Sequence, residues 1–117
     1  MAMSASTRIY NNTGGIIKFV SISQVNDDAT WDIQPSVGSV IQNSDSCLIA
    51  MGNSSCPPFV RGVGFNAKFV DSNLDLGGVY LDDPAIGAHS FNNTGDSFDF
   101  RVTNPSGNSY EVYITKK

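Results

Sequence analysis

The sequence contains few charged residues, and basic residues are the scarcer kind. Of its 117 residues 15% are charged, with seven Lys and Arg against 11 Asp and Glu, for a net charge of -4. Nucleic-acid binding and polybasic membrane attachment both need clustered Lys or Arg. The composition therefore argues against nucleic acid as a partner, and it leaves open membrane contact through apolar or aromatic side chains.

Long apolar runs are also absent. No segment approaches the roughly 18 apolar residues of a membrane-spanning helix, and the opening residues, MAMSASTRIYNN, contain no apolar core of a signal peptide. We therefore expect a protein that is cytoplasmic before release or that is secreted by a non-classical route.

Cysteine is equally scarce. Cys47 and Cys56 are too few for a disulfide framework. They could form one disulfide across a turn or remain two thiols, and a cytoplasmic location favours the thiols. No Cys/His cluster has zinc spacing.

Helical periodicity is almost missing, and short β-prone runs separated by turn residues take its place. Such runs at regular spacing are typical of an all-β sandwich or barrel. We predict an all-β fold, a single-domain antiparallel β-sandwich over residues 1–117, with strands at 7–10, 15–23, 30–33, 39–42, 47–51, 64–70, 78–81, 97–103 and 109–115.

The last two runs alternate most clearly. Phe98, Phe100 and Val102 should share one face of their strand. Tyr110, Val112 and Ile114 should do the same on the next strand. The segment 104–108, Asn-Pro-Ser-Gly-Asn, predicts a hairpin loop between them.

Metal and catalytic sites are the first functional candidates. Oxygen donors that calcium prefers gather at Asp82, Asp83, Asn92, Asn93 and Asp96, and 26–30 (Asn-Asp-Asp-Ala-Thr) fits the short pattern of βγ-crystallin calcium sites. Turns are rich in Asp and Asn for backbone reasons alone. The only histidine, His89, has no nucleophile elbow beside it. We predict no metal, no cofactor and no enzyme activity.

Aromatic residues at strand ends are the other candidates. Trp31 borders loops on both sides, and Tyr80 and Phe91 flank an Asp-rich segment. Aromatic rings at such places often face a ligand or a membrane interface, because a ring has an apolar body and polar edges. Packing in the core is the alternative for each.

Taken in order, these features resemble the aegerolysins, a family of small acidic β-sandwich proteins. The resemblance rests on ordered segments along nearly the whole chain: Ile-Tyr-Asn-Asn at 9–12, Gly-Gly at 14–15, Thr-Trp at 30–31, Gly-Asn-Ser at 52–54, Gly-Val-Gly-Phe at 62–65 and Val-Tyr-Leu-Asp-Asp-Pro-x-x-Gly at 79–87.

The resemblance implies the membrane lipid- or receptor-binding component of a pore-forming, cytolytic toxin system. Such a component recruits a larger pore-forming partner to target cell membranes, and it could form homo-oligomers. Candidate membrane-contact residues are Trp31, Arg61, Tyr80, Asp83 and Phe91.

The chain also departs from the fungal members. It has no tryptophan in 81–87, and Arg61 stands where an acidic residue is common. Specificity for sphingolipid is therefore not expected, and the Trp-poor sequence looks closer to bacterial insecticidal components. A calcium-dependent or carbohydrate-binding sandwich, lectin or βγ-crystallin-like, is the alternative function.

Overall fold

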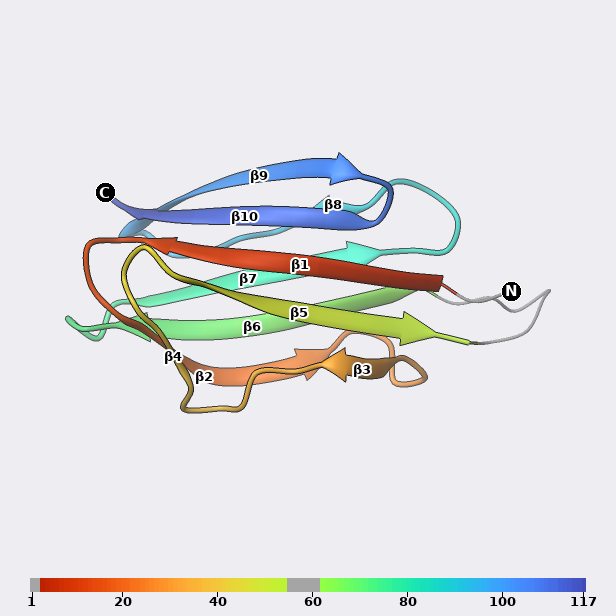
Figure 1. Ribbon diagram of the computed structural model, residues 1–117, viewed down its shortest axis with the longest axis horizontal. Coiled ribbons are helices and arrows are strands. Elements are labelled where there is room, and N and C mark those ends of the chain that lie inside the picture. Colours follow the sequence, from red (N-terminus) through yellow and green to blue (C-terminus); the bar gives the residue numbers. More distant parts are fainter. Residues whose placement is uncertain (1–2, 55–61) are drawn as a thin grey trace.

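Alternating apolar residues form ten β-strands in the computed structural model, which describes residues 3–54 and 62–117 (Figure 1). The strands are β1 (Met3–Asn12), β2 (Ile17–Gln24), β3 (Thr30–Ile33), β4 (Val40–Ile41), β5 (Ser46–Asn53), β6 (Val63–Asp71), β7 (Leu76–Asp83), β8 (Ser90–Phe91), β9 (Phe98–Ser106) and β10 (Ser109–Lys116).

The strands build two five-stranded sheets that pack face to face. Sheet A has the order β3-β5-β1-β10-β9, and sheet B has the order β4-β2-β6-β7-β8. The predicted all-β sandwich is confirmed. One pairing differs from the antiparallel expectation: β1 and β10 run parallel, with Thr7 opposite Tyr110. Parallel neighbouring strands need a long connection along the chain. Here that connection contains the strands β2 to β9.

The core lies between the sheets and is filled by the inward side chains of both. Sheet B contributes Phe19, Phe65 and Phe69, each exposed by 1% or less. Sheet A contributes the aliphatic residues Ile9, Ile49, Val112 and Ile114. Burial of this apolar surface is the main force that holds the sheets together.

The predicted hairpin is present, but its turn is shorter than expected. β9 continues through Pro105 to Ser106, and Gly107, with φ 52°, occupies the turn before Ser109. Pro105 can remain in the strand because β9 is the edge strand of sheet A, where a missing N–H breaks no interstrand bond.

Within the described ranges 3–54 and 62–117 the structure contains no helix that is long and apolar enough to cross a membrane.

Candidate functional site

The two sheets are joined by a buried polar pair at the end where β7 finishes. Asp83, the last residue of β7, is 3% exposed, and so is Tyr110 near the start of β10. The phenol of Tyr110 donates a hydrogen bond of 2.8 Å to Asp83 Oδ2. The pair therefore ties sheet B to sheet A through side chains.

Burial acts on the titration of both members of this pair. Burial raises the pKa of Asp83 above its usual value, although the hydrogen bond from Tyr110 and the nearby His89 oppose the rise. The pKa of Tyr110 is also raised. Burial is the largest cause, and the hydrogen bond to the Asp83 carboxylate and its charge are the next. Tyr110 therefore stays a hydrogen-bond donor, and the site does not supply a phenolate nucleophile.

Two further rings surround Tyr110. The ring of Phe91 on β8 lies 5.4 Å from that of Tyr110 in an edge-to-face arrangement, and the ring of His89 lies 4.6 Å from it. Phe91 is half-buried and packs against the core, whereas His89 is exposed. His89 therefore lies in the β7–β8 loop with its side chain open to solvent.

The loops rich in Asn and Asp use their side chains for structural hydrogen bonds. Asn26 Nδ2 donates to the Gly62 carbonyl at 3.0 Å, and Asn53 Nδ2 donates to Asp28 Oδ1 at 3.1 Å. Asn93 Oδ1 accepts from the Tyr80 N–H at 3.3 Å. Among residues 3–54 and 62–117, no three His, Cys, Asp or Glu side chains are placed to hold a metal ion.

The candidate membrane-contact residues do not form one cluster. Asp83 and Phe91 lie together around Tyr110. Trp31 lies on β3, at the edge of sheet A far from β9 in strand order, and packs against the core while remaining partly exposed. Tyr80 is half-buried on β7, opposite Asn66 of β6. Arg61 lies outside the described residues.

The structure describes one of the two cysteines. Cys47 is a half-buried thiol on β5, and burial raises its pKa to about 11. Such a thiol is a poor nucleophile near neutral pH. Cys56 lies outside the described residues.

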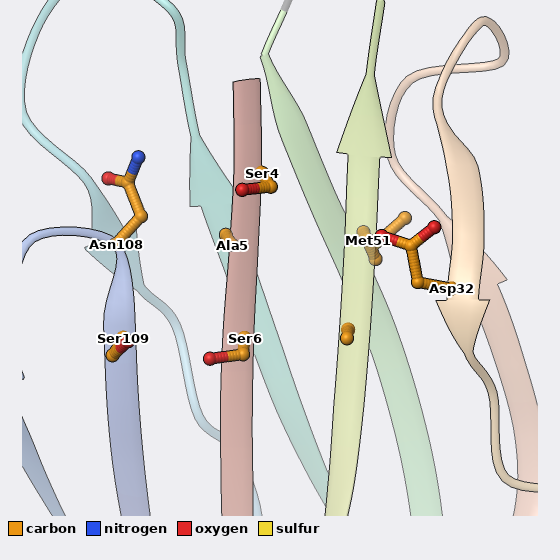
Figure 2. A pocket seen from close by; sticks show the side chains of 8 residues that line it. Ser4, Ala5, Ser6, Asp32, Met51, Asn108 and Ser109 are labelled. Carbon is orange, nitrogen blue, oxygen red and sulfur yellow. The ribbon is translucent and has the colours of Figure 1, made fainter. Parts of the chain in front are cut away.

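A polar depression of about 400 Å³ lies on the outer face of sheet A. Figure 2 shows Ser4 and Ser6 on β1, with Asn108 and Ser109 on one side and Asp32 of β3 on the other. The depression forms because the outward positions of the central strands carry small side chains, including Ala50. Hydroxyl, carboxamide and carboxylate groups there can bind a small polar ligand.

The sequence could not reveal this depression. Ser4 and Asn108 are far apart in the chain, and only the parallel pairing of β1 with β10 brings them together. The one signal in the sequence is the presence of small residues at alternate positions, as at Ser4 and Ser6.

The exposed apolar side chains are distributed unevenly. Among the described residues, large exposed apolar side chains are more numerous on sheet B than on sheet A: Val20, Val40 and Leu76 on its strands and Leu74 and Ile86 in its loops. Ile16, Val25 and Val37 lie in loops that connect the two sheets, and Ile33 and Val102 lie on the edge strands of sheet A. The outward residues of the central strands of sheet A, all within the described ranges, include the polar Ser6, Arg8 and Glu111 and no large exposed apolar side chain.

Comparison with known proteins identifies the fold. No family model matches the chain, and no curated protein matches it. The crystal structure of IP-1A from Alcaligenes faecalis superimposes with a TM-score of 0.71 at 16% identity, over 98% of this chain and 91% of that one. The crystal structure of the RahU protein with a Tris molecule gives a TM-score of 0.68 at 15% identity, over 96% and 92%. The chain therefore shares its fold with both proteins.

Proposed function

We propose that this protein is a non-enzymatic, aegerolysin-like binding component that docks on target membranes and recruits a larger pore-forming partner. Its fold is that of IP-1A and RahU, which are aegerolysin-like proteins. This similarity supports the fold that the ordered sequence motifs implied. Membrane lipid or a membrane receptor is the proposed ligand, and pore formation is assigned to the partner.

The observation that carries the proposal is the uneven distribution of exposed apolar side chains. Leu74 is 80% exposed, Leu76 is 57% exposed and Val40 is 42% exposed. Single exposed apolar residues are ordinary, but a gathering of them on one sheet is typical of a protein or membrane contact. The polar outer face of sheet A would then remain toward solvent.

Vesicle sedimentation tests the membrane contact. Vesicles of varied sphingolipid, sterol and insect-lipid content, together with insect membrane vesicles, should retain the protein in at least one composition. If none of them binds it, the proposed function is wrong.

Dye release tests recruitment. A large pore-forming protein encoded in a neighbouring reading frame is the expected partner. Release from vesicles should need both proteins, and release by this chain alone would contradict the division of roles.

A carbohydrate-binding function is the second candidate, and the polar depression on sheet A favours it. Asp32 and the hydroxyls of Ser4 and Ser6 could bind sugar hydroxyls there. A glycan array with wild type and Asp32→Ala tests this function. Binding that needs Asp32 would support it, and binding abolished by a chelator would indicate a calcium-dependent lectin.

A further inference from the structure

Leu74 stands at the tip of the β6–β7 hairpin in an unusual conformation. Its φ is 65°, in the left-handed region that Gly and Asn occupy most easily, and its side chain is 80% exposed. A leucine in this place is unfavourable for both the backbone and the solvated side chain. Such strain persists where other interactions impose it, and it is often found at functional positions.

The hairpin tip is held by specific hydrogen bonds. Asp71 Oδ1 accepts from the backbone N–H groups of Asn73 and Asp75, both at 2.9 Å. Lys116 on β10 forms ion pairs with Asp71 and Asp75. These hydrogen bonds and ion pairs therefore fix the turn that exposes Leu74 to solvent.

Behind the tip, a row of side chains crosses the outer face of sheet B. Strand register places Val40 of β4 beside Lys18 of β2, Lys18 beside Val70 of β6, and Val70 beside Leu76 of β7. Val40 is 42% exposed and Leu76 is 57% exposed. With neighbouring strands about 4.8 Å apart, the row spans about 14 Å. The row ends at Leu76, two residues after Leu74, so the tip and the row lie at the same end of sheet B.

Two lysines give this surface a positive charge in an acidic protein. Lys18 lies in the row, and Lys68 lies on β6 two residues before Val70; both are exposed. Within the described ranges 3–54 and 62–117, neither Lys18 nor Lys68 forms an ion pair with a carboxylate. Asp96 and Lys68 line the same shallow hollow. Asp82 lies on β7 four residues after Gly78, the residue opposite Lys68, which is about 13 Å along the strand.

We propose that this surface, the Leu74 face (Lys18, Val40, Lys68, Val70, Leu74 and Leu76), docks on an anionic lipid surface. The inference rests on the proposed membrane function and specifies its lipid class and contact. Leu74 and Leu76 enter the acyl boundary, and the lysine stems lie along the apolar surface while their ammonium groups reach anionic headgroups. A symmetric contact with a second copy fits less well, because it would bring the four lysines of two faces together.

Sedimentation of the full chain with two kinds of vesicle tests the proposal. One kind is phosphatidylcholine alone, and the other is phosphatidylcholine mixed with phosphatidylserine. The variants are Leu74→Asn and the double variant Lys18→Glu/Lys68→Glu. Matched controls are Ile86→Asn, an exposed aliphatic residue at the opposite end, and Arg101→Glu/Lys117→Glu, which changes the net charge equally. Melting temperatures confirm folding.

Wild type should bind the anionic vesicles more tightly, and high salt should weaken binding. Each Leu74-face variant should lose affinity by about tenfold or more, since one buried leucine and two interfacial lysines each contribute this much. Both controls should bind like wild type.

Other results overturn the proposal in distinguishable ways. Unchanged binding by both Leu74-face variants refutes it, and loss in Ile86→Asn places the contact at the other end, which leaves the proposed function intact. If wild type binds only the uncharged vesicles, the anionic-lipid proposal is wrong and the proposed function still stands. A dimer in solution that Leu74→Asn dissociates assigns the face to self-association instead.

Discussion

The phenol of Tyr110 donates a buried hydrogen bond of 2.8 Å to the carboxylate of Asp83, and this pair connects the two sheets at one end of the sandwich. Lys116 and Asp71 connect the same sheets near the other end. Apolar burial between the sheets has no direction of its own. The two polar pairs therefore help to define how the sheets are stacked.

Removing the Tyr110 hydroxyl should destabilise the protein. Tyr110→Phe keeps the ring beside Phe91 but leaves the Asp83 carboxylate buried without its donor. We expect a loss of about 1–3 kcal/mol in the free energy of unfolding, measured by urea denaturation. Tyr10→Phe is the control, because Tyr10 donates a longer bond of 3.3 Å to Glu111 that is only partly buried. Equal losses in the two variants would contradict the structural role of the pair.

The pair of Asp71 and Lys116 should make stability depend on pH in the acid range. Burial would raise the pKa of Asp71, but hydrogen bonds from Lys116 and from the backbone of Asp75 and Asn73 lower it below 3.8. A carboxyl with a lower pKa in the folded chain stabilises the fold above its unfolded pKa, and this contribution is lost as the pH falls through the folded value.

The stability difference between wild type and Asp71→Asn should therefore shrink as the pH falls from about 6 to about 2. Urea denaturation at each pH measures it. Lys116→Met should reduce the same acid-dependent contribution, since it takes away the side-chain partner while the backbone hydrogen bonds of Asp75 and Asn73 remain. A difference that stays constant with pH would show that the ion pair does not contribute.

Replacing Trp31 should reduce stability, because its ring packs against the core beside Met51 of β5. Since the ring is partly exposed, Trp31→Ala should cost about 2 kcal/mol, less than the ~3–5 kcal/mol of a fully buried aromatic. Trp31→Phe should cost less than Trp31→Ala. Thermal denaturation and vesicle sedimentation of the same samples separate the two roles: lost binding with an unchanged melting temperature would make Trp31 a lipid contact.

Leu74→Asn should stabilise the protein although it weakens lipid docking. Asn adopts the left-handed conformation more easily than Leu, so relief of backbone strain should add about 0.5–1 kcal/mol. Leu76→Asn is the control, because Leu76 lies in a regular strand where no such relief is available. Chemical denaturation measures both. A stability loss in Leu74→Asn would mean that the side chain contributes packing in the folded protein.

Much of the fold could be predicted because side chains alternate along a strand with a period of two. Residues 98–103 and 109–115 show this pattern, and both became strands of the predicted hairpin. β8 was missed because its two residues, Ser90 and Phe91, are too few to show alternation. The Asn-rich segment that follows lies along β7, where Thr94 pairs with Gly78.

The candidate site was predictable only in part. The aromatic character of Trp31, Tyr80 and Phe91 was visible, but their separation across the sandwich depends on strand order. The residues Asp-Ser-Asn at 71–73 have the composition of a turn, yet no local rule places a leucine next to them at positive φ. Leu74 was therefore not a candidate.

The sequence by itself determined that the chain is an all-β sandwich, since alternation and turn chemistry act between near neighbours. Only the tertiary structure decided that β1 runs parallel to β10, that Asp83 meets Tyr110, and that Val40, Lys18, Val70 and Leu76 form one row. These relations join residues distant in the chain. They follow from which strands become neighbours and in which register, and alternation is the same for every choice of neighbour.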